Sequence, residues 1–535
     1  MKKYADLHCH PHSRAFHWMR HTKNERKPSR FNPWNIVLSN FKKQQEGKRA
    51  FSYSQCDPVK LWNGQTKLVF ASLYPFEKGF FQGGELEQSK VIRILDVLST
   101  SGLGFLNPIK WAQAAFAFIT GAPTALKIAR VFLQSLLMRM PLRRIKYFIS
   151  GNYDYYEELI LERDFLLSNS GEVVRNNVYI PGFRRLIKSA RKLRKKYPES
   201  LDATGKYVIC SEYNEVKSVL DNDEIAMVLT IEGLHALGTD TNLEKVLERV
   251  DEIKQWDTPA FFITFAHHFN NFLGGHAHSI PNSLSILSDQ TDGMNGGMQP
   301  IGEEVVRILL GLNESLEKDE SLGRRILIDL KHSSALSRKW YYQNIVAPCI
   351  AKGDTIPVIL SHMGFSGWGT LEESINYANL ENDHELKDGF YPWNINACGE
   401  DVVWAAKTGG LIGLNFDQRI LGDKKDKIRS IDLLWDNLKA MVEVILDSDE
   451  LSEEQKSICW SYFTLGTDFE GYIDPTQDYS NSLLFDDFEQ DLLDKLRLLQ
   501  ELDGAKYHLN SQVETDEAAR MIFFENAHQF LKKHF

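Results

Sequence analysis

Five apolar segments of the chain each end in a histidine, glutamate or aspartate, the side chains that bind metal ions and move protons in many enzymes. In a parallel β-barrel, catalytic residues come from the C-terminal ends of several strands. The pattern therefore predicts a metal site at the mouth of a barrel. The five segments are Tyr4–His10, Ala226–Glu232, Ile326–His332, Pro357–His362 and Phe463–Asp468.

These segments offer enough ligands for two cations. His8 and His10 lie two residues apart, so a strand turns both side chains to the same face, where they can share one ion. Glu232 can bridge the two ions, and His332 and His362 can hold the second. Nitrogen and carboxylate ligands of this kind suit zinc.

A pair of cations is typical of hydrolytic centres. Two ions held about 3.5–4 Å apart clamp a water nucleophile and polarise the carbonyl group that it attacks. Asp468, at the exit of the last segment, is then left to move protons. Any one of the histidines alone is more often an ordinary polar residue, so the prediction rests on all five segments together.

Apolar runs that suit buried strands alternate with helical patterns along the chain. The runs are continuous, as in strands covered on both faces of a parallel sheet. Helical patterns include residues 301–312 and 430–445. Eight strand–helix units predict the α/β class and a (β/α)8 TIM-type barrel. The strand-like runs are 4–10, 66–74, 224–232, 259–267, 325–332, 357–362, 409–416 and 463–469.

Two stretches exceed what a minimal barrel needs. Residues 11–65 are polar and rich in aromatic residues, and residues 75–206 form a large, mostly helical insertion between the second and third strands. Barrels of about 250 residues commonly grow past 400 by insertion. We therefore expect residues 1–535 to form a single metallo-hydrolase barrel domain that carries both insertions.

The larger insertion contains an apolar run at residues 111–126, bounded by lysines and followed by a basic segment. A spanning helix needs about 20 apolar residues, so we do not expect a transmembrane segment. A helical lid or a subunit contact is favoured over binding to a membrane surface, and a homodimer is left open.

The composition limits which binding partners and which cellular compartment we expect. A net charge of −10 argues against a nucleic-acid partner, which needs a basic face. The six cysteines include no CxxC pair, which suits a reducing compartment. Strand alternation turns Cys9 away from its histidine neighbours, so we expect it to pack in the core. The first predicted strand follows Met1 almost at once, leaving no room for a signal peptide, so we expect a cytoplasmic protein.

The motifs resemble those of the membrane (renal) dipeptidases, zinc metallopeptidases of the amidohydrolase superfamily. The resemblance runs in order along roughly two-thirds of the chain and spares 11–65 and most of 75–206. The segments that carry it are Thr230–His235, Ile263–Asn270, Gly302–Arg307, Ile328–Ser333, Pro357–His362, Gly409–Phe416, Gly466–Gly471 and Glu525–Phe530.

The resemblance implies a barrel with two Zn²⁺ ions, or another divalent metal, that cuts an amide bond in a small dipeptide-like substrate. Asp468 resembles the acid/base that takes a proton from the bridging water and passes it to the leaving amine. His267 resembles the histidine that stabilises the oxyanion, which needs a donor placed at the transition-state oxygen. The positions that match metal ligands are His8, His10, Glu232, His332 and His362.

Two departures from the family pattern matter. The family has Asp where this chain has His10, so the charge of the site rises by about one unit. The family also has an Arg after the sixth strand that grips the substrate carboxylate, whereas residues 389–401 contain none. Asn394 or Asn396 can join in binding without supplying that charge. Hydrolysis of a lactone, an ester or a non-peptide amide therefore stays an alternative, as does a non-catalytic metal-binding or interaction protein.

Other polar residues have two interpretations each. His276 and His278 form a second HxH after the fourth strand, which is either loop structure or a contact to substrate or an accessory ion. Alternation predicts that His268 points away from the site. Three aspartates either support metal ligands from behind or cap neighbouring elements. They are Asp6, Asp329 and Asp417.

Overall fold

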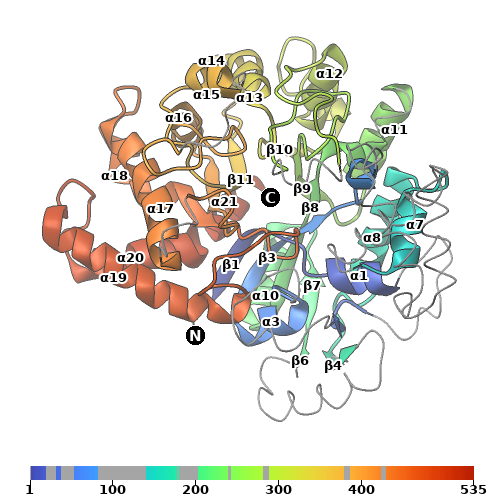
Figure 1. The fold of residues 1–535 in the computed structure, drawn as a ribbon, viewed down its shortest axis with the longest axis horizontal. Helices are drawn as coiled ribbons and strands as arrows, with labels where there is room; N and C mark the ends of the chain where they lie inside the picture. The colour runs from blue at the N-terminus through green and yellow to red at the C-terminus, as the bar shows by residue number, and fades with distance from the viewer. Residues whose placement is uncertain are drawn as a thin grey trace, which may run out of the picture.

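Eight parallel strands form a barrel at the centre of the molecule, as the computed structural model shows (Figure 1). Each strand pairs with the next in chain order, so the predicted (β/α)8 barrel is confirmed. The strands are β1 (Tyr4–Cys9), β3 (Thr66–Leu73), β8 (Ile225–Glu232), β9 (Ala260–Thr264), β10 (Leu327–Asp329), β11 (Ile359–Met363), β12 (Leu411–Leu414) and β13 (Phe463–Leu465). The structure describes residues 2–19, 32–37, 54–81, 140–175, 178–179, 203–238, 243–280, 288–378, 386–422 and 429–535.

The barrel closes between its first and last strands. Cys9 and Phe469 form a parallel bridge. The backbone N–H of Asp468 donates to the carbonyl of His8, and that of His10 donates to the carbonyl of Phe469, both at 2.9 Å. The seam of the barrel therefore lies at residues that the sequence predicts to bind metal and move protons.

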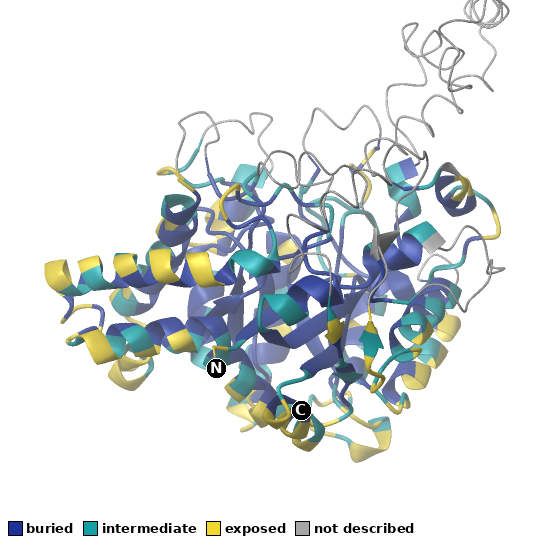
Figure 2. Cartoon of the chain, turned by 90° about the horizontal axis from the view of Figure 1, so that it is seen from below, coloured by how far each residue is buried: buried dark blue, intermediate teal, exposed yellow. Residues whose placement is uncertain are grey.

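Helices surround the barrel, so that the strands are buried and the exposed residues lie on the outer helices (Figure 2). The predicted helical patterns correspond to α12 and α17; α17 buries Leu434, Leu438 and Met441, the spacing of an amphipathic helix. The helices are α1 (Ser13–Met19), α3 (Pro58–Asn63), α7 (Leu142–Phe148), α8 (Tyr155–Leu167), α10 (Tyr213–Asp221), α11 (Leu243–Lys254), α12 (Pro300–Leu309), α13 (Ala335–Tyr341), α14 (Ala347–Ala351), α15 (Leu371–Ala378), α16 (Gly399–Thr408), α17 (Ser430–Asp447), α18 (Glu453–Ser457), α19 (Phe485–Asp503), α20 (Gln512–Arg520) and α21 (Asn526–His534).

Several short strands could not be predicted from the sequence pattern. β7 (Tyr207–Ile209) pairs in parallel with β8 outside the barrel path. Two further pairs join β2 (Ile36–Val37) to β5 (Val178–Tyr179), and β4 (Val174–Arg175) to β6 (Thr204–Gly205). Runs of two or three residues are too short for hydrophobic periodicity to reveal them.

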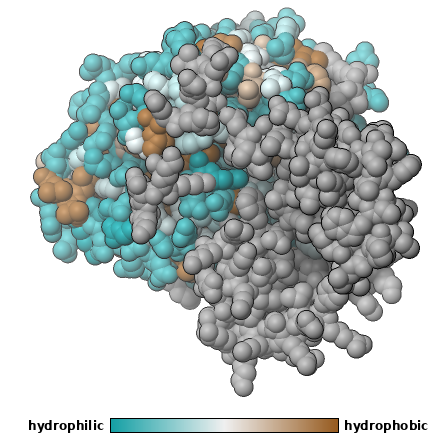
Figure 3. All heavy atoms as spheres, viewed as in Figure 1, coloured by the Kyte–Doolittle hydropathy of each residue, from teal (hydrophilic) through white to brown (hydrophobic). Residues whose placement is uncertain are grey.

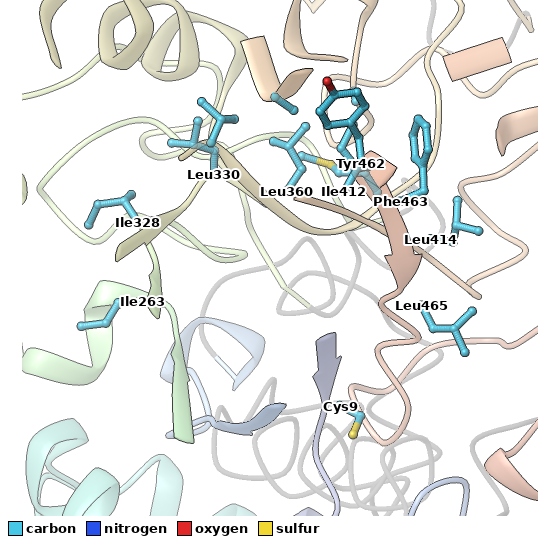
Figure 4. Close-up of a cluster of buried hydrophobic side chains, with 14 of the residues drawn as sticks. Cys9, Ile263, Ile328, Leu330, Leu360, Ile412, Leu414, Tyr462, Phe463 and Leu465 are labelled. Atoms are coloured by element: carbon cyan, nitrogen blue, oxygen red, sulfur yellow. The ribbon is translucent and has the colours of Figure 1, made fainter. Parts of the chain in front are cut away.

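The largest apolar cluster lies between the strands and the helices that cover them, and Figure 4 shows part of it. Cys9 belongs to this cluster, as expected. Leu7 belongs to a different cluster, with Phe70, Val228 and Ile359. Simple alternation would place Leu7 and Cys9 together, but the pairing of β1 with β3 shifts register between Asp6 and Cys9. The irregularity reorients the end of the strand that carries the first two histidines.

The insertion between β3 and β8 is described in part. Helix α8 lies beside α11 (Figure 1), and the guanidinium of Arg249 on α11 lies 4.8 Å from the ring of Tyr156 on α8. The apolar run at 111–126 falls outside the described residues, as does Arg139 of the basic segment. The other basic residues of that segment, Arg143, Arg144 and Lys146, lie on α7, where Arg144 is buried and paired with Glu158. None of the helices in the described ranges combines the length and the apolar content that crossing a bilayer requires.

All six cysteines are buried and free. Where described residues are visible in Figure 3, the surface is largely hydrophilic with scattered apolar side chains. This distribution is ordinary, since single exposed apolar residues occur on most protein surfaces.

Candidate metal centre

The carboxylate of Glu232, at the end of β8, lies among five histidines from other strand exits. Its Oε2 atom is 3.2 Å from Nε2 of His10. The site is almost closed to solvent, since Glu232 is only 2% exposed. The distances from Oε1 to the Nε2 atoms are 3.2 Å for His8, 3.4 Å for His267, 3.5 Å for His332 and 3.7 Å for His362.

Two groups of side chains have ligand atoms close enough to hold a metal ion, and they share Glu232. Within each group the ligand atoms all lie within 4.8 Å of one another. The structure thus brings the five expected ligands and Asp468 together at one end of the barrel. The first group is His8, His10, Glu232 and Asp468, and the second is Glu232, His332 and His362.

Several of these buried atoms have no hydrogen-bond partner among the residues that the structure describes. They include Nε2 of His8, Nε2 of His10 and Oδ1 of Asp468. A buried polar atom without a partner is costly, and native proteins contain few of them. A divalent cation between these atoms would satisfy all three, so the donor set fits a metal ion.

The outer nitrogens of two ligands are held so that the inner nitrogens keep a lone pair for a cation. Nδ1 of His10 lies 3.0 Å from the carbonyl oxygen of Ser72, which can only accept, so the proton is on Nδ1. The Ser361 hydroxyl lies 2.8 Å from Nδ1 of His362 and donates its own proton to Asp329. Ser361 therefore accepts from His362, and Nε2 of that ring is free for a ligand bond.

Of the three aspartates, Asp6 and Asp329 lie directly behind the ligands. Asp329 accepts from the hydroxyls of Ser361 at 2.6 Å and Thr264 at 2.7 Å. Asp6 accepts from the hydroxyl of Thr467 at 2.6 Å and from its N–H at 3.0 Å. Burial raises the pKa of Asp6 to about 6 and also raises that of Asp329.

Asp417 has a different partner, because its carboxylate binds the Nε of Arg419 at 2.8 and 2.9 Å. It therefore holds a neighbouring loop residue rather than a ligand.

Asp468 lies at the edge of the two groups. Its Oδ1 is 3.6 Å from Nε2 of His10, and its Oδ2 is 3.9 Å from Nε2 of His362. Burial raises the pKa of Asp468. Its backbone φ is 59° and that of His332 is 64°, a conformation that non-glycine residues seldom adopt. Such strained positions cluster at functional sites, where the surrounding structure holds them.

His267 is held by Glu77, a residue that the sequence analysis did not single out. Nδ1 of His267 lies 2.5 Å from Oε2 of Glu77, which also accepts from the Tyr74 hydroxyl at 3.3 Å. Burial disfavours the charged forms of both Glu77 and His267, but their opposite charges attract each other more strongly. The imidazole therefore lowers the pKa of Glu77 to about 2. The carboxylates of Glu232 and Glu77 raise the pKa of His267 to about 9.

The expectation that His268 points away from the site is wrong. Its ring centroid lies 4.0 Å from that of His267 and 4.9 Å from that of His332. Strand β9 ends at Thr264, so strand alternation no longer applies at His268, four residues later. His267, His268 and His332 form a third group that could hold a metal ion.

The second HxH has the contacts of loop structure. Nδ1 of His276 lies 3.1 Å from the carbonyl of Ala277, and its Nε2 lies 3.0 Å from that of Asp292. The ring of His278 stacks on Trp393 with centroids 3.9 Å apart. Among the described residues, neither histidine joins a candidate metal group.

The two asparagines in the segment that lacks Arg have partners within the fold. The side chain of Asn394 donates to Asn295 at 2.7 Å and accepts from the N–H of His278 at 3.3 Å. The amide of Asn396 donates to the carbonyls of Tyr391 at 2.9 Å and Ile420 at 2.6 Å. Both side chains therefore hold loops together.

No protein-family model matches the chain, and no curated protein matches it. It is similar to the solved structure of a metallo peptidase from Rhodobacter sphaeroides liganded with a phosphinate mimic of the dipeptide L-Ala-D-Ala, at 10% identity and a TM-score of 0.46, over 100% of this chain and 99% of the other.

It is also similar to the dipeptidase AC, a metallo peptidase, at 11% identity and a TM-score of 0.45, over 94% of this chain and 98% of the other. The probable dipeptidase PvdM from Pseudomonas aeruginosa is similar at 11% identity and a TM-score of 0.37, over 90% of each chain. These proteins are described as metallopeptidases or dipeptidases. The barrel itself is established by the chain's own strand pairing.

Proposed function

We propose that the chain is a hydrolase that uses two divalent cations to cut an amide bond in a small dipeptide-like substrate. The observation that carries the proposal is the pair of candidate ligand groups that share the buried carboxylate of Glu232. Imidazole and carboxylate donors suit Zn²⁺, which is our first choice of metal. Other divalent metals that accept imidazole are the alternative.

In this proposal each ligand set holds one cation. His8 and His10 would hold the first, His332 and His362 would hold the second, and Glu232 would contribute to both. When bound, such a pair lowers the pKa of a water molecule and polarises the carbonyl group of the substrate. This assignment is supported by the Nε2 atoms of His8 and His10, which have no hydrogen-bond partner among the described residues.

Asp468 is proposed to move the protons. Its side chain is 12% exposed, so a water molecule or a substrate can reach it. It also lies beside the expected ligands. A carboxylate at this position can accept the proton of the attacking water and pass it to the leaving amine. The left-handed backbone at Asp468 and the bridge that closes the barrel place the side chain there.

His267 is proposed to donate a hydrogen bond to the oxyanion that develops on the attacked carbonyl. Glu77 holds Nδ1, and Nε2 is 3.4 Å from Oε1 of Glu232, on the side of the metal groups. A fixed donor aimed at the site where charge develops is among the larger contributions to catalysis.

A second candidate function is hydrolysis of an uncharged lactone, ester or non-peptide amide. The observation that favours it is the loop at residues 389–401, which has no cation and whose Asn394 and Asn396 are committed to other loops. A dipeptide carboxylate would need a partner from elsewhere, whereas an uncharged substrate would need none. The non-catalytic alternative has less support, because Asp468 and His267 both accompany the ligand groups.

The test combines metal analysis with substrate panels on the purified full chain. We expect about two zinc ions per chain and turnover of dipeptides whose C-terminal carboxylate is free. Turnover of lactones or esters alone would establish the second candidate instead. A chain that binds no metal and turns over neither panel would leave the non-catalytic alternative.

A further inference from the structure

We infer that the mouth of the barrel carries a third cation position, formed by His267, His268 and His332, which binds excess zinc and thereby inhibits the reaction. The inhibition rests on the proposed function, whereas the cation position itself does not. The ligand atoms of the three histidines lie within 4.8 Å of one another. This trio of residues is called the rim trio below.

The rings of the rim trio face each other closely. The centroids of His267 and His332 are 4.4 Å apart, and that of His268 is 4.0 Å from His267 and 4.9 Å from His332. Three imidazoles with an open fourth position form one of the common zinc sites in proteins. The geometry therefore suits a borderline divalent cation such as Zn²⁺.

Two of the three rings are held from behind, as metal-binding histidines generally are. Glu77 holds Nδ1 of His267 at 2.5 Å, and the Ser279 hydroxyl lies 2.6 Å from Nδ1 of His268. Gln290 fixes that loop, because its amide nitrogen lies 2.6 Å from the carbonyl of His268 and 2.5 Å from the Ser279 oxygen. These contacts engage Nδ1 of both rings, so Nε2 is the atom of each ring that can bind a cation, in exchange for any proton that it carries.

The rim trio differs from the two proposed catalytic groups in charge and in access. It contains no carboxylate, whereas both other groups contain Glu232. His268 is only partly buried, whereas every member of the other two groups is buried. We therefore expect the rim trio to bind zinc more weakly than the catalytic pair and to fill only when zinc is in excess.

Filling the rim trio would interfere with both proposed roles of its members. A ring nitrogen that binds a cation cannot donate a hydrogen bond, so His267 would lose its role at the oxyanion. His332 is shared with the second catalytic group, so a cation in the rim trio would draw this ring away from the second catalytic cation, which would keep Glu232 and His362 as ligands. Excess zinc should therefore lower the rate rather than raise it.

The experiment titrates Zn²⁺ into the holoprotein that already carries its tight pair. Calorimetry is expected to show a further equivalent of zinc binding, and the hydrolysis rate is expected to fall over the same zinc range. His268→Gln should weaken this further binding at least tenfold and remove the inhibition, with the tight pair and the rate in low zinc unchanged. Ser279→Ala should weaken it about tenfold, the usual effect of removing a partner behind a ligand.

His278→Gln is the matched control, since this histidine lies in the same loop but in no metal group among the described residues. It should leave the further binding intact. Wild-type protein that binds no zinc beyond the pair, or His268→Gln that still binds it, would overturn the inference. Circular dichroism checks the fold of each variant, and Ser279→Ala carries the test if His268→Gln is misfolded.

The two proposals fail in different ways. Further zinc binding that His268→Gln abolishes, in a chain that turns over no substrate, supports the rim trio and counts against the proposed hydrolase. Turnover that excess zinc leaves unchanged, with no binding beyond the pair, supports the hydrolase and overturns the rim trio.

Discussion

Glu77 and His267 are 190 residues apart in the chain, yet their side chains meet at 2.5 Å beside the candidate metal centre. Glu77 follows strand β3 and His267 follows β9, so the contact joins the insertion to the rim of the barrel. The carboxylate also accepts from the N–H of Phe269 at 3.1 Å. Glu77 therefore fixes both the ring of His267 and the backbone that carries it.

Replacing Glu77 tests whether this positioning matters for the rate. In Glu77→Gln the charge is lost while one acceptor remains, so His267 should be placed less well and be less polarised. We expect kcat to fall at least tenfold. The fall should be smaller than that caused by losing the oxyanion donor itself, which costs about a hundredfold or more. Because Glu77 touches no expected ligand of the metal pair, KM and the bound metal should change little.

Steady-state kinetics with metal analysis make this measurement. Glu373→Gln is a suitable control, since that carboxylate also accepts backbone N–H groups, those of Gly369 and Thr370, but on the exposed surface. An unchanged kcat in Glu77→Gln would mean that His267 needs no orientation from Glu77.

Asp468 is the residue whose loss should affect the rate most without affecting the metal. Asp468→Asn keeps an oxygen near the ligands but cannot accept a proton from water. General acid–base catalysis contributes about 10²–10⁴-fold, so we expect kcat to fall by that range. Metal analysis should still find the tight pair, because the five expected ligands are unchanged.

Asp388→Asn provides the control for this substitution. Asp388 also has a positive φ, of 53°, but its side chain is 71% exposed and pairs with Lys387. The same chemical change in the same backbone conformation should therefore leave the rate unaltered. If Asp468→Asn lost its metal, the fall in rate would say nothing about proton transfer, and Asp468 would instead be a ligand.

The ligands and the barrel could be predicted from the sequence because their signals are strong and regular. The eight runs are long and apolar enough to be covered on both faces, and each is short enough to be a strand. In a parallel barrel the ends of such strands converge whatever the loops do. The proximity of Glu232 and His362 can therefore be predicted without knowing the path of the chain between them.

The contacts beyond the strand ends could not be predicted in this way. His268 follows β9 by four residues, where the chain has left the strand and alternation no longer sets the direction of a side chain. Glu77 lies in an irregular segment whose path depends on the tertiary fold. A carboxylate shortly after the second strand was the only sequence signal for it, and many surface loops have one.

Thr467 is the residue through which Asp6 holds the last strand. Its hydroxyl donates to Oδ2 of Asp6 at 2.6 Å, and Asp468 follows it directly. Thr467→Val keeps the shape but leaves the buried carboxylate with one partner fewer, which should cost about 1–3 kcal/mol of unfolding free energy. We expect kcat to fall as well, because the backbone before Asp468 loses its anchor.

Thr464→Val is the matched control, three residues earlier on β13. Within the described part of the chain the buried Thr464 hydroxyl has no hydrogen-bond partner, so its removal should be neutral or stabilising. Denaturant unfolding of both variants gives the comparison. Equal losses of stability would show that the Asp6 contact contributes nothing beyond the change of side-chain type.

Lys254, at the end of α11, should make stability depend on pH. Its ammonium donates to the carbonyl of Ile308, and burial lowers its pKa to about 8 from an ordinary 10.5. Between these two values the unfolded chain binds more protons than the folded one, so stability should rise as pH increases from 8 to 10.5. The slope from this group is at most about 1.4 kcal/mol per pH unit.

Lys254→Met should remove that rise, since methionine keeps an apolar side chain of similar length and has no proton to lose. The measurement is the unfolding free energy of both proteins across pH 7–10, at constant ionic strength and constant metal concentration. Lys217→Met on α10, where the side chain is 61% exposed, should leave the rise in place. A wild-type profile that is flat over this range, or one that falls, would show that Lys254 keeps its charge in the folded protein at no cost.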